Sequence, residues 1–527
     1  MRIREGLRWG VLYVLLACAL LPELTFHIGT RIATGDGSGD AYQNLWYLWW
    51  VGRALQRGLD IYHTDRLFWP VGTSLVFHTL MPVHGVLSLP AQALWPGSLG
   101  LVVSLNVLTL SSFALTGFGA HLVARQHGAT LTGACAAGLL AMTVPYRFWH
   151  LNHLNLLSTH TALFTLWLLH RSWSGGTWRA ALGLGLCAAV TTYTDYEIAL
   201  YTAVAGLVSI AWYAVTTPHE PQRWLRLAAA AISALLLHLP LLGALLDPSR
   251  AVTARPPASD AQQLSANLLA QLGPAPMSLL WAPVRPFELA AHNGIGGDEA
   301  ALGPVFVCAL LGLACLRRER AARLWLALGA LFVVLSLGPS LRIGASTWLT
   351  DDMPYAWLTR AIPALSMGRS PVRMGNMAAI FLAIALGLSL ARPHGRARLA
   401  AWSCVLGLLA LERTRTYAPA LEDVRMPRAY LTLAAAPEDF AIMPTPVGYV
   451  HQQLYMFWQT LHGKALTTGG GARTAPEDTR FLQLLASVPS DAERMRLLHE
   501  AGVRYVVVHT SRAGDLTKLE PRIIPVP

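Results

Sequence analysis

The chain has 527 residues, of which 54% are hydrophobic and only 13% are charged. Soluble globular proteins carry about 25% charged residues, so this composition argues against a soluble protein. The net charge of +11 does not indicate nucleic-acid binding, because the arginines are scattered through short loops between apolar segments. These features predict a membrane protein in contact with lipids.

The first apolar stretch, residues 9–28, follows Arg2, Arg4 and Arg8. Its length is near the ~20 residues that cross a bilayer. No small-residue cleavage site precedes the next loop, so we expect a retained first span rather than a signal peptide.

Arginine clusters predict the topology, because basic residues concentrate in cytoplasmic loops. The densest cluster is RRERAAR at residues 317–323. With these clusters in the cytoplasm, about eleven transmembrane helices are expected, near residues 9–28, 100–124, 130–146, 155–171, 180–196, 197–215, 224–246, 301–316, 322–338, 372–391 and 397–411. The stretch 80–96 contains three prolines and is expected not to cross, as a re-entrant or interfacial helix.

The chain therefore divides into a transmembrane domain, residues 1–411, and a tail, residues 412–527. A long first loop (29–99) faces the outside, as does the tail. The tail has strand-like runs such as YVVVH, a probable helix and a GGG turn signal. This pattern predicts a small soluble α/β domain on the outer face.

The first outer loop begins GDGSGDAYQNLWYLWW (35–50) and contains Asp36 and Asp40. The residues after Asp40 predict a helix with tryptophans near one face, which would place them at the lipid headgroups: Trp46, Trp49 and Trp50. A carboxylate beside such a helix is well placed to act on a lipid headgroup. The alternative is that Asp40 only caps the helix after a Gly-rich turn.

A calcium loop is a further alternative, because Asp36, Ser38 and Asp40 have the spacing at which such loops start. The pattern then fails, since Ala41 stands where the loop needs glycine and Tyr47 where it needs glutamate.

The segment PYRFWHLNHLN (145–155) gathers Arg147, His150 and His153. The two histidines are three residues apart and could share a helical face. Two histidines alone do not make a zinc site. The segment is either an interfacial anchor with structural hydrogen bonds or a contact for phosphate or sugar.

TDYE (194–197) places Asp195 and Glu197 at or near membrane depth. Carboxylates there are costly and usually face a cavity or a partner. Because they are two positions apart, we expect at most one to point inward. The alternative is a structural pair with Arg147.

GRSPVR (368–373) places Arg369 and Arg373 at the start of the tenth expected span. Guanidinium groups at that depth suit phosphate binding through paired hydrogen bonds. The alternative is ordinary snorkelling to the interface. The topology gathers these arginines with His153, Asp195 and the first-loop carboxylates on one outer face.

Residues 35–72 resemble the first outer loop of the bacterial branch of the GT-C superfamily of integral-membrane glycosyltransferases. In that loop an acidic residue follows the first span, and an aromatic helix, a G-x-x-x-Y step and a P-x-G turn come next. Further matches are HLNHLN (150–155), TDYE (194–197), LSLGPSL (335–341), PYAWLTRAIPALSMGRSPVRM (354–374) and QTLHGKALTTGGGAR (459–473).

The resemblance implies a sugar donor on polyprenyl phosphate, an outward-facing cavity and a glycan, lipid or protein acceptor. Asp40 would correspond to the catalytic aspartate, with Asp36 as second candidate. Many members carry Asp-Glu here, whereas Ala41 follows Asp40, so the choice between the two stays open. The remaining assignments are donor-phosphate contacts (Arg369, Arg373, His153 and Arg147) and supporting residues (Asp195, Glu197 and His150). No cofactor is expected, and no pattern supports a metal.

The prediction is thus an inverting glycosyltransferase with an aspartate base in the bacterial inner membrane. Its N-terminus would be cytoplasmic and its C-terminal domain periplasmic. A nucleotide sugar is not expected as direct donor, because no Gly-rich phosphate loop follows a strand. Two alternatives remain: a lipid or solute transporter, for which we find no internal repeat, and a non-catalytic membrane scaffold.

Overall fold

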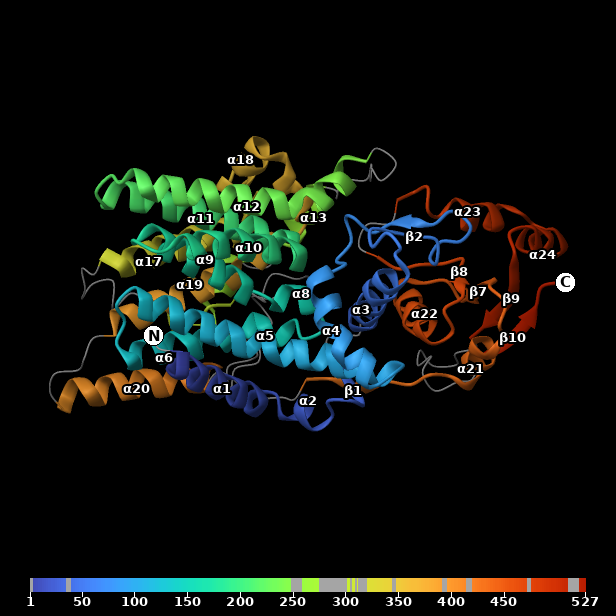
Figure 1. The fold of residues 1–527 in the computed structure, drawn as a ribbon, viewed down its shortest axis with the longest axis horizontal. Helices are drawn as coiled ribbons and strands as arrows, with labels where there is room; N and C mark the ends of the chain where they lie inside the picture. The colour runs from blue at the N-terminus through green and yellow to red at the C-terminus, as the bar shows by residue number, and fades with distance from the viewer. Residues whose placement is uncertain are drawn as a thin grey trace.

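The computed structural model describes residues 3–34, 39–247, 258–273, 301–303, 306–308, 310, 320–343, 347–390, 396–413, 419–471, 475–509 and 521–527. Figure 1 shows an elongated molecule, with a bundle of long helices at one end and a smaller head at the other. We use "head" for first-loop residues 39–81 together with the tail from residue 419. The N-terminus lies in the bundle and the C-terminus at the tip of the head (Figure 1).

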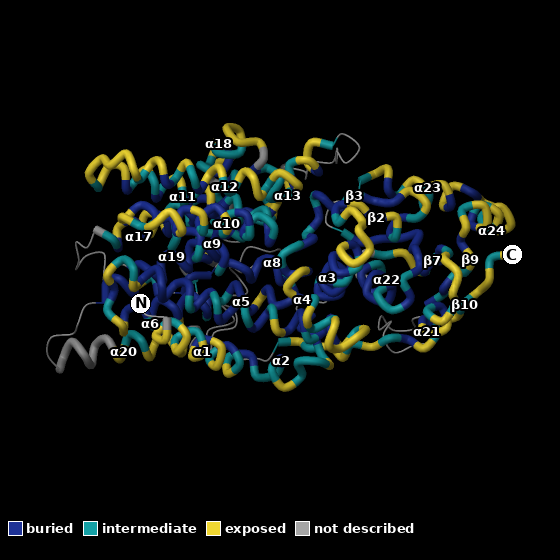
Figure 2. The backbone as a smooth tube through the Cα atoms, in the orientation of Figure 1, coloured by how far each residue is buried: buried dark blue, intermediate teal, exposed yellow. Residues whose placement is uncertain are grey.

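Four helical segments of the described chain are long and apolar enough to cross a membrane: Ser98–Gln126 (α5), Tyr196–Thr216 (α11), Pro221–Leu246 (α12) and Pro371–Ser389, which contains α19 (Met374–Ser389). Much of helix α12 is coloured as exposed at the edge of the bundle (Figure 2), and its exposed residues include a row of leucines. Such a row is stable against lipid rather than water. The chain is therefore a multi-pass membrane protein.

Shorter helices occupy other expected spans: α1 (Ile3–Leu20), α6 (Leu131–Met142), α9 (His160–Trp173), α10 (Trp178–Thr194), α17 (Arg320–Ser336) and α20 (Arg396–Arg413). The expected span at 301–316 lies mostly outside the described residues, so the number of crossings stays a prediction. The stretch 80–96 forms α4 (Pro82–Leu94), whose 13 residues are fewer than the ~20 that cross a bilayer.

Helix α19 forms the centre of the bundle, and 94% of its span is buried. It is apolar on all sides because α17, α6 and α5 surround it. Glycines allow the closest approach: a Cβ added to Gly133 of α6 would lie 2.2 Å from the carbonyl oxygen of Gly387. Small residues at such crossings let membrane helices pack backbone to backbone.

The tail contains a four-stranded mixed sheet. Its strands are β7 (Ala441–Thr445), β8 (Ala465–Leu466), β9 (Val503–Val508) and β10 (Arg522–Pro525). Strand β7 is parallel to β8 and β9, whereas β10 is antiparallel to β9. The helices of the tail are α21 (Arg428–Ala435), α22 (Tyr449–His462), α23 (Arg480–Ser487) and α24 (Asp491–Glu500). The sequence prediction of an α/β tail agrees with this arrangement.

Further described elements are short. They are α2 (Pro22–Phe26), α7 (Pro145–Trp149), α8 (Leu154–Leu157), α13 (Ala258–Gln263), α14 (Leu268–Leu272), α18 (Pro354–Ala361), η4 (Pro363–Met367), η5 (Pro371–Arg373), β2 (His63–Thr64), β3 (Thr73–Ser74), β4 (Leu341–Ile343) and β5 (Thr347–Thr350).

The first loop and the tail share one hydrophobic core. Helix α3 (Asp40–Arg57) packs against α22, and strand β1 (Arg31–Ala33) pairs with β6 (Leu421–Asp423). One cluster of buried side chains contains residues from α3, α5, α22 and the sheet. The boundary near residue 412 stays a prediction, because the tail packs against the rest of the chain.

The expected position of the α3 tryptophans at the lipid headgroups does not match the structure. Trp46 and Trp50 have 0% and 1% exposed surface, and their rings stack 5.7 Å apart. The Nε1 of Trp46 donates to Oε1 of Gln459 at 2.6 Å. The tail, which is hundreds of residues away in sequence, takes the place that we expected lipid to occupy.

We predict that Trp46→Ala strongly destabilises the protein, by about 3–5 kcal/mol, because a buried tryptophan leaves a large cavity. Thermal unfolding of the full chain in detergent measures the effect. Trp357→Ala is the control, since 54% of that residue is exposed, and it should leave the melting temperature almost unchanged. Equal melting temperatures for the two variants would contradict the buried position of Trp46.

Candidate active site

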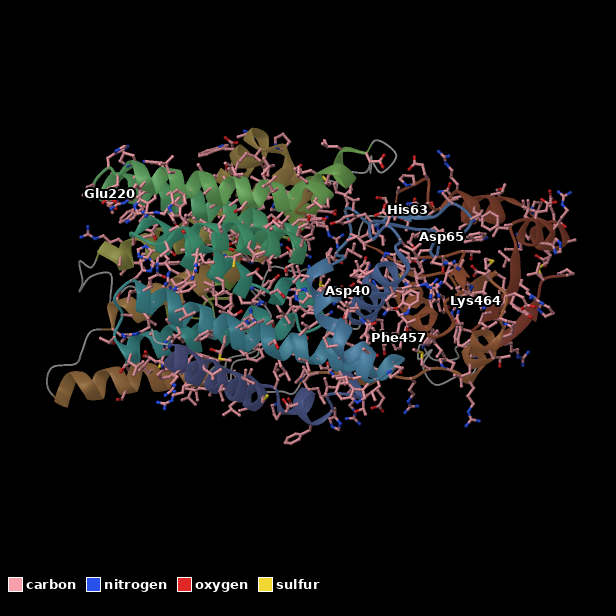
Figure 3. The ribbon with its side chains drawn as sticks, in the orientation of Figure 1. Asp40, His63, Asp65, Glu220, Phe457 and Lys464 are labelled. Atoms are coloured by element: carbon pink, nitrogen blue, oxygen red, sulfur yellow. The ribbon has the colours of Figure 1, made fainter. Side chains whose placement is uncertain are left out.

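Asp40 is the first residue of α3 and lies at the junction between the bundle and the head (Figure 3). The preceding Gly39 has a φ of 81°, a conformation that favours glycine. A Cβ on Gly39 would also lie 2.2 Å from Oε1 of Gln453. The positive end of the helix dipole favours a carboxylate at this position. The turn at Gly39 thus presents Asp40 beside α22.

The two carboxylate oxygens of Asp40 contact different parts of the chain. Its Oδ2 lies 2.7 Å from Nε2 of His153, whereas its Oδ1 accepts a hydrogen bond from Nε2 of Gln453 at 3.1 Å. About a fifth of the Asp40 and His153 side chains is exposed: 20% and 21%. This partial exposure leaves the Asp40 carboxylate accessible from outside the chain.

His153 lies in the turn between α7 and α8, together with His150. Their Nδ1 atoms are 3.3 Å apart, and the His150 ring lies against Tyr146 with centroids 4.1 Å apart. The expected single helical face is not formed, but the turn brings the two rings together. Nδ2 of Asn44, on α3, donates to the carbonyl of Asn152 at 2.8 Å. This bond fixes the turn against the helix that carries Asp40.

A second polar cluster is linked to the first through the same segment. Asn155 stands two residues after His153, and its Nδ2 donates to Oδ2 of Asp195 at 2.7 Å. NH1 of Arg373 lies 2.9 Å from both carboxylate oxygens of Glu197. The segment HLNHLN therefore contacts both Asp40 and the cluster at 195–197.

Both carboxylates of TDYE have partners, contrary to the expectation that at most one points inward. Asp195 has an extended backbone (φ −161°, ψ 129°) and caps α11 by accepting from the N–H of Ile198 at 2.8 Å. Helical spacing therefore does not apply to it. Glu197 lies inside the first turn and pairs with Arg373, not with Arg147.

Arg147 and Arg369 occupy opposite environments. Arg147 has 0% exposed surface and donates to the carbonyl of Leu157 and to Oγ1 of Thr159, both at 2.9 Å. A guanidinium without exposed surface cannot contact a ligand in this conformation. Arg369 is exposed, four positions before Arg373. Of the two, only Arg369 is placed to meet a ligand from outside.

Asp36, the second catalytic candidate, and Ser38 of the calcium-loop alternative lie outside the described residues. Among the residues that the structure describes, no three His, Cys, Asp or Glu side chains gather at a metal-binding distance.

Sequence reasoning missed Gln453 and Asn155 as partners of the carboxylates. Asn155 stands in HLNHLN, so its proximity to His153 could have been read from the motif, although its bond to Asp195 could not. Gln453 stands 413 positions from Asp40, and no local pattern distinguishes it from other polar residues of an amphipathic helix.

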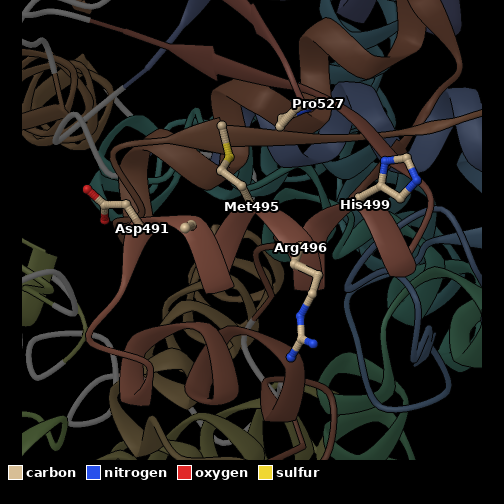
Figure 4. Close-up of a pocket in the computed structure, with 6 residues that line it drawn as sticks. Asp491, Met495, Arg496, His499 and Pro527 are labelled. Atoms are coloured by element: carbon tan, nitrogen blue, oxygen red, sulfur yellow. The ribbon is translucent and has the colours of Figure 1, made fainter.

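A hollow on the surface of the head is separate from these residues. It lies along α24 beside the C-terminal proline (Figure 4), and it is lined by Asp491, Ala492, Met495, Arg496, His499 and Pro527. Helix α24 is at the tip of the head, whereas Asp40 lies at the bundle (Figures 1 and 3). The hollow therefore takes no part in the candidate site.

We predict that Glu197 and Arg373 are energetically coupled. A double-mutant cycle with Glu197→Gln and Arg373→Gln should give about 1–3 kcal/mol, because neighbouring charges with mostly buried side chains do not act independently. Unfolding of the four proteins in detergent measures the coupling.

The pair Asp352 and Arg360 provides the control, since both of its side chains are more than half exposed. Exposed pairs contribute little, so its cycle should show no measurable coupling. If the Glu197 cycle also gave none, the ion pair at α11 would not exist in solution.

Comparisons with known proteins place the chain in a family. The sequence model of a family described as "Domain of unknown function (DUF6311)" matches residues 10–411. This range includes Asp40, His153, Glu197 and Arg373, but not Gln453. No curated protein matches the chain.

Several solved structures share the fold. The cryo-EM structure of arabinofuranosyltransferase AftD from Mycobacteria has a TM-score of 0.64 and 16% identity over 99% of this chain, which spans 36% of AftD. The apo crystal structure of the Archaeoglobus fulgidus oligosaccharyltransferase has a TM-score of 0.51 and 12% identity, covering 96% of this chain and 70% of that one. ArnT from Cupriavidus metallidurans has a TM-score of 0.43 and 14% identity, with 96% and 93% covered.

At these identities the likeness establishes the fold. The chain thus spans about a third of AftD, the first of these proteins. The chain belongs to the DUF6311 family, and its fold is that of the GT-C superfamily of membrane glycosyltransferases.

Proposed function

We propose that the protein is a membrane glycosyltransferase that moves a sugar from polyprenyl phosphate to an acceptor on the extracytoplasmic face. The observation that carries this proposal is the pair of Asp40 and His153 at the junction of bundle and head, partly exposed and 2.7 Å apart. The fold supports it, because AftD and the oligosaccharyltransferase are named as glycosyl-transferring enzymes.

Asp40 would act as the general base. The acceptor hydroxyl oxygen attacks the anomeric carbon as the bond from that carbon to the phosphate oxygen breaks, and the hydroxyl proton passes to Asp40. The leaving group departs as polyprenyl phosphate, and displacement from the opposite side inverts the anomeric centre. His153, on Oδ2, orients the carboxylate and places positive charge near the leaving phosphate when it is protonated.

The leaving phosphate would be stabilised chiefly by Arg369. The charge of Arg373 is balanced by Glu197, whereas no described residue forms an ion pair with the exposed Arg369. A hydrogen-bond donor directed at the negative charge that develops on the leaving group is among the largest contributions to the rate of such a reaction. Arg373 then keeps the 368–373 segment in position and adds hydrogen-bond donors.

The arginine-rich loops support the extracytoplasmic orientation. Glu220, just before α12, lies at the end of the bundle far from the head (Figure 3), and Arg223 and Arg226 follow it in sequence. With that end in the cytoplasm, the head and Asp40 lie in the periplasm of a bacterial inner membrane. The transport alternative is less favoured, because apolar α19 fills the bundle centre.

We predict that Asp40→Asn lowers turnover by about 10²- to 10⁴-fold, the usual contribution of a positioned base. The assay incubates purified full-length protein with radiolabelled sugars on polyprenyl phosphate and measures release of the lipid phosphate. Arabinofuranose is the first sugar to test, because AftD is named for it.

Asp65→Asn serves as the matched control, since Asp65 lies in the same loop and 60% of its side chain is exposed. It should retain wild-type turnover. Near-wild-type turnover of Asp40→Asn would remove Asp40 from the role of base. A wild-type protein that releases no lipid phosphate from any polyprenyl-phosphate sugar would argue for a scaffold.

A further inference from the structure

We infer that the tail completes the active site, with Gln453 of α22 as the positioning residue that holds the carboxylate of Asp40. This inference rests on the proposed function, since it assigns a residue to the same reaction. It also extends the catalytic unit beyond residues 10–411, the range that the family model matches.

Gln453 is fully buried, with 0% exposed surface, although glutamine is a polar residue. Its Nε2 donates to Oδ1 of Asp40 at 3.1 Å and lies 3.5 Å from Oε1 of Gln43. These two acceptors are both on α3. A single amide group therefore connects the tail to the catalytic carboxylate and to the helix that carries it.

Gln43 extends this hydrogen-bond network to Tyr47, Gly470 and His78. Nε2 of Gln43 donates to the hydroxyl of Tyr47 at 2.7 Å and to the carbonyl of Gly470 at 3.3 Å. The Tyr47 hydroxyl lies 3.2 Å from Nδ1 of His78. The carboxylate of Asp40 and Oε1 of Gln43 can only accept hydrogen bonds, whereas an amide nitrogen can only donate them. The amide group of Gln453 is therefore oriented with its nitrogen toward Asp40.

The amide oxygen of Gln453 is buried at a free-energy cost, which indicates that the amide N–H is the important group at position 453. Oε1 of Gln453 is buried, and no described residue donates a hydrogen bond to it. It lies against Gly39, where a side chain would collide with it. An apolar side chain of similar length would avoid the free-energy cost of burying an acceptor that has no hydrogen bond. It would, however, leave Oδ1 of Asp40 without its N–H donor.

Two donors on opposite oxygens fix the carboxylate plane of Asp40. Gln453 holds Oδ1 from the tail and His153 holds Oδ2 from the bundle, so the carboxylate cannot rotate freely about its Cβ–Cγ bond. A reacting group held in the productive geometry accounts for a large share of enzymatic rate enhancement. An N–H donor also favours the charged carboxylate, the form that accepts a proton.

The test compares Gln453→Met with Gln459→Met in full-length protein, using the polyprenyl-phosphate arabinofuranose assay. Both glutamines are fully buried on α22, but Gln459 bonds to Trp46, Arg66 and Lys464 and not to Asp40. Both variants should lower the melting temperature. Only Gln453→Met should lower kcat by about ten-fold, with little change in KM for the donor.

A second readout separates positioning from structure. Loss of the N–H donor should move the acid limb of the pH–kcat/KM profile to higher pH in Gln453→Met, because the carboxylate form is less favoured. Gln459→Met should keep the wild-type profile.

Gln453→Asn keeps an amide but shortens its reach, and it decides the question if the methionine variant does not fold. The inference fails if a folded Gln453 variant retains wild-type kcat and pH profile while Asp40→Asn is inactive. If Asp40→Asn also retains full turnover, or if the wild type transfers no sugar, the proposed function itself fails.

Discussion

Helix α3 carries Asp40 on its first turn, and the packing of α22 against α3 joins the tail to the first loop. The buried indole of Trp46 donates to Gln459, and the stacked Trp50 fills the space beside it. Gln459 in turn donates to the carbonyls of Arg66 and Lys464. Removing any of these groups would leave buried polar atoms unsatisfied, which costs about 1–3 kcal/mol each. The first loop and the tail therefore constrain each other.

The position of the candidate site follows from the difference between the two halves of the molecule. The bundle has an apolar interior around α19 and an apolar surface that suits lipid, whereas the core of the head continues into the adjoining end of the bundle. Most of the charged side chains of the candidate site pair with one another. Asp40 contacts His153, Glu197 contacts Arg373, and Asn155 donates to Asp195.

The sequence predicted those features of the site that depend on residues close to one another in the chain. The turn and aromatic helix after the first span placed Asp40 at a helix start, and HLNHLN indicated that His150 and His153 lie together. The arginines before the tenth span indicated a charged cluster, although Arg147 and not Arg373 was considered as the partner of the TDYE carboxylates.

The sequence did not predict contacts between residues that are far apart in the chain. Gln453 lies 413 positions from Asp40, and the tryptophans of α3 have the same pattern whether lipid or protein covers them. Arg147 likewise reads as a phosphate ligand in sequence, but its guanidinium lies inside the bundle, 4.5 Å above the ring of Phe113.

A structure of the full chain with a bound polyprenyl phosphate would test the central claim most directly. The account predicts a phosphate beside Arg369, with its lipid chain leaving between helices of the bundle. The phosphate oxygen that carries the sugar would then lie on the side of the site that contains Asp40. A phosphate bound on the cytoplasmic side, or in the head away from the junction of bundle and head, would contradict it.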